Sequence, residues 1–137
     1  MSQYTTIYFC KDEQELVLQW WGTTLSRTFL SDAFPYTVEK ATFDVDNVIQ
    51  VLNEGVEEAE RNVKRNKDEI AKYESLVVCC KEASAAEALL ERIDNTNAFL
   101  KEEMEDLDLY QGIVRNMQFI KSIAEENEGW ALYYKNC

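Results

Sequence analysis

The chain contains no histidine, only one proline and only four glycines among its 137 residues. Without histidine, a serine or cysteine nucleophile lacks its commonest base, and the usual ligand sets of structural zinc and di-iron carboxylate sites are incomplete. No glycine-rich phosphate loop is present. These absences favour a binding or interaction protein over an enzyme, and we expect no cofactor and no catalytic residue.

The four cysteines, Cys10, Cys79, Cys80 and Cys137, form no C-x-x-C spacing. Adjacent residues on a helix point in different directions, so Cys79 and Cys80 are poorly placed to bridge each other. No uncharged apolar run approaches the roughly 20 residues of a membrane span, and the N-terminus lacks a signal-peptide pattern. We therefore expect a cytoplasmic protein in a reducing compartment.

Positive charge is also scarce, because the chain has 26 acidic residues and only 14 basic ones, which gives a net charge of −12. Most of the acid lies in the region from residue 44 to residue 128. Such a chain is repelled by nucleic-acid backbones and by anionic membrane surfaces. We expect neither direct nucleic-acid binding nor membrane binding. A small acidic chain of this kind is typical of phage and accessory bacterial proteins.

What the sequence does contain is a long heptad pattern that predicts an antiparallel helical hairpin from about Asp46 to Glu126. The first seam comprises Ile49, Leu52, Val56, Ala59, Val63, Asn66, Ile70, Tyr73, Val77 and Cys80. The second comprises Ala86, Leu90, Ile93, Asn97, Leu100, Met104, Leu107, Gln111 and Val114. Folding back near residues 81–84 pairs Val77 with Ala86, Ile70 with Ile93, Val63 with Leu100 and Val56 with Leu107.

Finer features support this register. It places Asn66 near Asn97, where two amides can hydrogen-bond inside the seam, and Gly55 near Tyr110. Ser84, followed three residues later by glutamate, has the capping-box pattern of a helix start. The hairpin loop is therefore expected to be short.

The rest of the chain predicts strands, giving an α+β fold in a single domain of residues 1–137. The expected sheet is small and antiparallel, formed by an N-terminal hairpin and a C-terminal strand, and packed at the open base of the long two-helix coiled-coil hairpin. The expected strands are Tyr4–Cys10, Leu16–Trp21, Leu25–Leu30, a short strand at Glu39–Phe43, and Trp130–Tyr134. The expected division is 1–43 strands and loop, 44–82 first helix, 84–128 second helix and 129–137 closing strand, with Asp44 or Asp46 as the first N-cap.

Three groups of residues are candidate binding sites. Aromatic and basic residues predict a small-ligand pocket at the sheet or at a subunit interface, suited to a nucleotide-like molecule: Trp20, Trp21, Arg27, Arg115, Trp130 and Tyr133. Acidic residues along the hairpin predict a partner-binding face: Glu57, Glu58, Glu60, Glu102 and Glu103. Apolar residues off the seam predict self-association at the hairpin tip: Leu76, Val78, Cys79 and Leu89.

The leading hypothesis is a non-enzymatic, oligomeric interaction protein that acts as an inhibitor or adaptor. It is expected to bind itself and a partner protein through its acidic hairpin. One alternative is a protein that binds or sequesters a nucleotide-like ligand at the aromatic pocket. A second alternative is a Mg²⁺-dependent nucleotide pyrophosphohydrolase, because pairs such as Glu54 with Glu57 and Glu102 with Glu105 put two carboxylates on one helix face.

Overall fold

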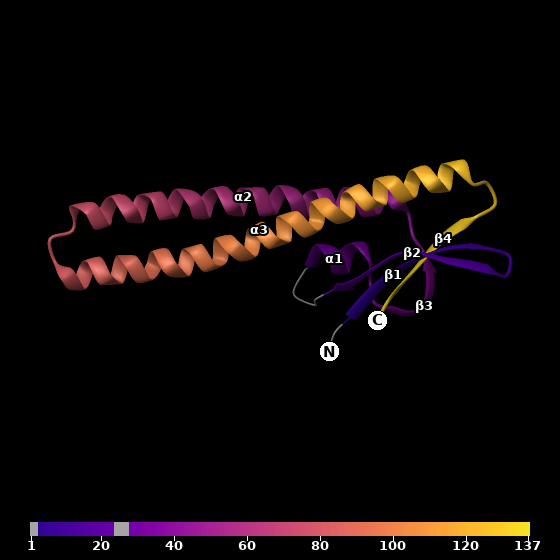
Figure 1. The fold of residues 1–137 in the computed structure, drawn as a ribbon, viewed down its shortest axis with the longest axis horizontal. Coiled ribbons are helices and arrows are strands. Elements are labelled where there is room, and N and C mark those ends of the chain that lie inside the picture. The colour runs from indigo at the N-terminus through magenta and orange to yellow at the C-terminus, as the bar shows by residue number, and fades with distance from the viewer. Residues whose placement is uncertain (1–2, 24–27) are drawn as a thin grey trace. The chain divides into compact units, whose positions relative to one another are not determined.

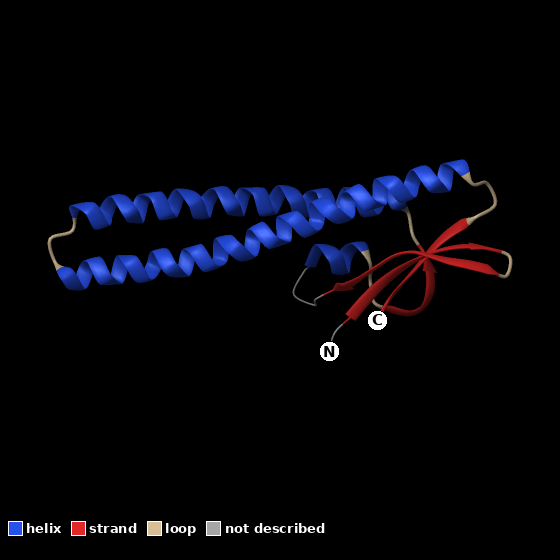
Figure 2. Ribbon diagram, viewed as in Figure 1, coloured by secondary structure: helices blue, strands red, loops and turns tan. Residues whose placement is uncertain are grey.

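The computed structural model describes residues 3–23 and 28–137 of the chain, apart from the side chains of Thr23 and Thr28. It confirms an α+β protein with two long packed helices and one antiparallel sheet (Figures 1 and 2). The elements in chain order are β1 (Gln3–Lys11), β2 (Gln14–Thr23), α1 (Thr28–Ala33), β3 (Thr37–Thr42), α2 (Val45–Cys79), α3 (Ala83–Glu126) and β4 (Ala131–Asn136). None of the described helices combines the length and apolar character that a bilayer span requires.

The chain divides into two compact units, one made of residues 1–54 and 111–137 and the other of Gly55–Tyr110. Each long helix contributes to both units, because the division falls within α2 and within α3. The second unit is the helical hairpin, and the first contains the whole sheet.

In the first unit, the sheet has the strand order β2-β1-β4-β3 and all its neighbouring strands are antiparallel. The C-terminal strand β4 therefore lies among strands from the first third of the chain, yellow among indigo and purple in Figure 1. The predicted N-terminal hairpin, the short strand near residue 39 and the closing strand are confirmed. The expected third strand, Leu25–Leu30, is wrong over Thr28–Leu30, because these residues begin α1, and residues 25–27 lie outside the described part.

The core of the first unit surrounds Phe34, whose side chain is completely buried beside the only proline. Three rings contact it edge to face: Trp21 at 5.4 Å, Tyr134 at 5.4 Å and Phe43 at 5.8 Å between ring centroids. The Tyr134 hydroxyl donates a 3.1 Å hydrogen bond to the carbonyl of Pro35, and burial raises the pKa of Tyr134. The segment before β3 is thus held against β4 by aromatic packing and hydrogen bonding.

The start of α2 follows the sequence prediction. The Asp44 carboxylate accepts a 3.0 Å hydrogen bond from the backbone N–H of Asp46, and its carbonyl accepts one from Val48. Asp44 is therefore the N-cap. Asp46 instead binds Lys121 of α3 at 2.7 Å, and this hydrogen bond, with the attraction of the two charges, raises the pKa of Lys121.

In the second unit, the α2 half of the predicted seam is confirmed, because every described seam residue from Val56 to Cys80 is buried or half-buried. The α3 half is correct only at every seventh residue: Ala86, Ile93, Leu100 and Leu107 are covered. The other predicted seam residues, Leu90, Asn97 and Met104, are exposed. The residues one position before each of them are covered instead, namely Leu89, Thr96 and Glu103, and so is Tyr110.

The displacement of the α3 seam by one residue follows from the burial of Tyr110, the last of the covered residues named above. Tyr110 and Gly55 are both buried, as the predicted pairing of a large ring with a residue lacking a side chain requires. Counting back in sevens from Tyr110 gives Thr96 rather than Asn97. The predicted Asn66–Asn97 pair is therefore wrong, because Asn66 is buried but Asn97 is exposed.

The turn between the helices also differs from the predicted capping box. Helix α3 begins at Ala83, so Ser84 already lies inside it. The carbonyl of Glu82 accepts the first helical hydrogen bond, from Ala86 at 3.1 Å. Glu82 therefore occupies the N-cap position.

Two isomeric side chains on α3 test the corrected seam. Ile93→Ala should lower the free energy of unfolding by about 2–4 kcal/mol, because Ile93 is buried between the helices. Leu90→Ala removes the same atoms from an exposed position and should cost less than about 1 kcal/mol. Chemical denaturation measures both values, and a larger loss for Leu90→Ala would restore the original register.

Candidate interaction surface

The two faces of the sheet differ in what covers them. Along β1, Thr5, Ile7 and Phe9 are buried, whereas the intervening residues are exposed or half-buried. We call the first side the inner face and the second the outer face. The inner face belongs to the core of the first unit, so the outer face is the side on which side chains remain accessible.

A β-bulge in β2 decides which of its residues reach the outer face. Ile7 pairs with Gln19 and Tyr8 with Val17, so Leu18 is the extra residue. Because of this bulge, Val17 and Trp20 both lie on the outer face although they are three residues apart. Strict alternation would have placed them on opposite faces.

At one end of the outer face, two aromatic rings stack and stay accessible. Tyr4 and Trp20 lie 4.9 Å apart between centroids, with ring planes only 10° from parallel. Trp20 is 61% exposed, Tyr4 is 41% exposed, and nearby Val17 is 59% exposed. A stacked pair of this kind is a rigid apolar platform in contact with water.

Toward the other end, positive charge covers a tyrosine. The ammonium of Lys40 lies 5.1 Å from the centre of the Tyr8 ring, and that of Lys135 lies 5.7 Å from it. Both distances fall within the range of cation–π attraction. Lys40 also forms an ion pair with Glu15, which connects the edge strands β3 and β2. Tyr133 pairs with Tyr8 on this face.

The structure distributes the predicted ligand-pocket residues over separate places. Trp20 and Tyr133 lie on the outer face, whereas Trp21 packs on Phe34 of the core. Trp130 stacks on Phe9 at 5.1 Å and borders a shallow hollow of about 630 Å³ with the hairpin turn, Lys11–Gln14. Arg115 is exposed on α3, and Arg27 lies outside the described residues.

Two buried polar atoms on the inner face have no hydrogen-bond partner among the described residues: the Thr5 hydroxyl and the Trp21 indole N–H. Thr5 and Trp21 are cross-strand neighbours in the sheet. A buried water could satisfy both, since such waters bridge otherwise unpaired polar groups. They belong to the core rather than to the accessible surface.

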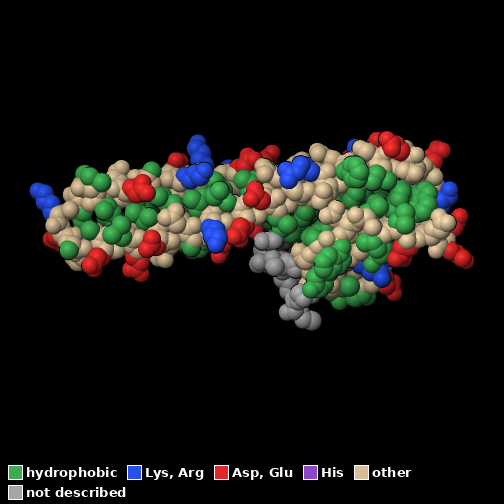
Figure 3. All heavy atoms as spheres, in the orientation of Figure 1, with side chains coloured by type: hydrophobic (Ala, Val, Ile, Leu, Met, Phe, Trp, Pro, Cys, Tyr) green, Lys and Arg blue, Asp and Glu red, His purple; other side chains and the backbone are tan. Residues whose placement is uncertain are grey.

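The predicted acidic face consists of Glu57, Glu58, Glu60 and Glu102, which are exposed, and Glu103, which is half-buried in the seam. Successive helical residues are about 100° apart, so Glu57, Glu58 and Glu60 point in different directions. On the side drawn in Figure 3, acidic side chains are interspersed with apolar and basic ones. Of the predicted tip residues, Leu76, Val78 and Cys79 are exposed, and Leu89 lies in the seam.

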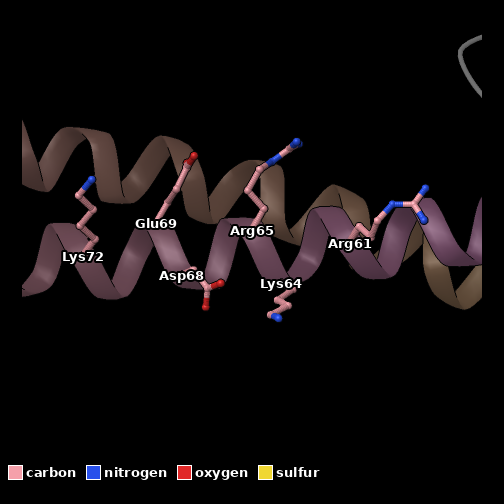
Figure 4. A pocket seen from close by; sticks show the side chains of 6 residues that line it. All are labelled: Arg61, Lys64, Arg65, Asp68, Glu69 and Lys72. Atoms are coloured by element: carbon pink, nitrogen blue, oxygen red, sulfur yellow. The ribbon is translucent and has the colours of Figure 1, made fainter.

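A stretch rich in basic residues, not predicted from the sequence, lies within the acidic hairpin. A shallow hollow of about 360 Å³ on α2 is lined by Arg61, Lys64, Arg65, Asp68, Glu69 and Lys72 (Figure 4). Their side chains project away from the helix, some to each side, and opposite charges recur four residues apart, as in Lys64 with Asp68. Such spacing supports an exposed helix, so this is a solvated mixed-charge surface rather than an enclosed site.

No group of three or more potential metal-ligating side chains occurs among the residues that the structure describes. Comparison of the chain with family models, curated proteins and solved structures found no match. The outer face of the sheet is therefore the candidate interaction surface on structural grounds alone.

Adjacent tryptophans test whether this surface is separable from the core. Trp21→Ala should lower the free energy of unfolding by about 3 kcal/mol, because it removes a ring packed on Phe34. Trp20→Ala should cost about 1 kcal/mol, the contribution of its stacking on Tyr4. Urea denaturation compares the two, and equal losses would place Trp20 in the core.

Proposed function

We propose that this protein is a non-enzymatic interaction protein that binds a partner protein through the outer face of its sheet. The observation that carries the proposal is the exposed Tyr4–Trp20 stack beside Val17. Aromatic side chains of this kind dominate binding energy at protein interfaces, and clustered apolar exposure commonly marks such sites. The protein would act as an adaptor or inhibitor.

The chemistry of the surface describes its partner. Tyr4, Trp20 and Val17 would receive an apolar or aromatic side chain, whereas Lys135, whose ammonium lies over Tyr8 toward the other end, favours a carboxylate. A partner segment that combines apolar and acidic residues fits both ends. The acidic hairpin remains a competing location for partner binding, through Glu57, Glu58, Glu60, Glu102 and Glu103.

Partner capture from extracts of the native host distinguishes these locations. The double variant Tyr4→Ala with Trp20→Ala should lose bound partners that the unmodified protein retains, because it removes the apolar platform. The triple variant Glu57→Lys, Glu58→Lys and Glu60→Lys should retain them. The opposite pattern would move the binding site to the acidic hairpin and contradict the proposal.

A nucleotide-like ligand is the second candidate function, and one arrangement favours it. On the outer face, Thr6 pairs with Trp20 on one side and Lys135 on the other. Since neighbouring strands are about 4.8 Å apart, Trp20 and Lys135 stand roughly 10 Å apart across the sheet. A base stacked near Trp20 could then direct a phosphate toward Lys135.

A thermal-shift screen with nucleoside mono-, di- and triphosphates tests this candidate. A binding nucleotide should raise the melting temperature in a concentration-dependent way, and Lys135→Ala should reduce that rise. Absence of any shift at millimolar nucleotide would eliminate the ligand hypothesis. Measurement of triphosphate turnover with Mg²⁺ in the same samples addresses the pyrophosphohydrolase alternative.

A further inference from the structure

The two edges of the sheet are protected to different degrees. The β3 edge is short and pairs with β4 only at Thr37, Ala41 and Thr42, because the register is interrupted over Val38, Glu39 and Lys40. Bulges, charged residues and short length are the means by which proteins prevent an edge strand from pairing with another chain. The β3 edge therefore has the features of a protected edge.

The β2 edge lacks most of this protection. It is ten residues long, pairs with β1 from end to end apart from the single extra residue Leu18, and contains no proline or lysine. Within the residues that the structure describes, β2 is hydrogen-bonded to β1 alone. Leu16, Val17 and Trp20 are exposed along it. Such a strand presents unpaired backbone groups beside apolar side chains, which is a template for another strand.

Charge limits which part of the surface a second copy of this chain can approach. A chain of net charge −12 repels a second copy of itself over most of its surface. Glu15 is the only ionisable residue of β2, and Lys40 of the same chain neutralises it. The β2 edge is therefore a place where a second copy can approach without strong repulsion.

We propose that two copies of this chain pair through β2, antiparallel to each other, to form one continuous eight-stranded sheet. Antiparallel pairing of identical strands follows a two-fold axis perpendicular to the sheet, so it closes as a dimer and covers both β2 edges. The same symmetry places both outer faces on one side. The two Tyr4–Trp20 stacks then share one surface, which becomes bivalent for a partner.

Two exposed valines on opposite edges provide a matched test. Val17 on β2 and Val38 on β3 are each 59% exposed, so the substitution to lysine makes the same change at both. Analytical ultracentrifugation should give the unmodified protein twice the 16.0 kDa chain mass. Val17→Lys should raise the dimer dissociation constant at least tenfold, through charge repulsion near the axis, and Val38→Lys should leave it unchanged.

Hydrogen exchange in the unmodified chain provides a second measurement that does not depend on the variants folding. Amides of β2 should exchange more slowly as protein concentration rises, and amides of β3 should not change. A monomer throughout the concentration range, a dimer that survives Val17→Lys, or concentration-dependent protection at β3 instead of β2 would each overturn the proposal. The inference does not rest on the proposed function, because Tyr4→Ala on β1 alters the outer face and should leave the dimer intact.

Discussion

The alternation of side chains along β1 is the constraint on which the rest of the sheet unit depends. Thr5, Ile7 and Phe9 are buried on the inner face, which fixes Tyr4 and Tyr8 on the outer face. The cross-strand neighbours on β2 and β4 then follow the same division. An aromatic sequence that reads as one hydrophobic cluster therefore separates into a packed core and an accessible surface.

The acidic and basic residues are also distributed unevenly between the helices and the outer face of the sheet. The helices carry most of the acid, and a mixed-charge stretch on α2 interrupts it. On the outer face, the positive groups of Lys40 and Lys135 lie over Tyr8, and the acidic Glu15 is paired. The outer face and its β2 edge thus combine apolar exposure with little net negative charge. That combination supports association at the sheet rather than along the hairpin.

The sequence was sufficient to predict the α+β class, the α2 seam, an N-cap at Asp44 or Asp46 and the main strands, because each depends on local periodicity or local chemistry. The α3 row was wrong by one residue, since Leu89 and Leu90 are both apolar and the heptad pattern allows either, whereas Thr96 and Tyr110 are the buried residues. The outer face was not predictable either. Its composition depends on the bulge at Leu18, and a bulge shifts alternation without a distinctive sequence pattern.

The most direct test of this account is the accessibility of Trp20 in the unmodified fold. Fluorine NMR of protein labelled with fluorotryptophan reports all three tryptophans, and Trp20→Phe and Trp21→Phe assign the two resonances to be compared. The account predicts that the Trp20 resonance shows the largest shift between H₂O and D₂O, because its ring is on the accessible face. A shift for Trp20 as small as that of Trp21 would contradict it and would place the Tyr4–Trp20 stack in the core.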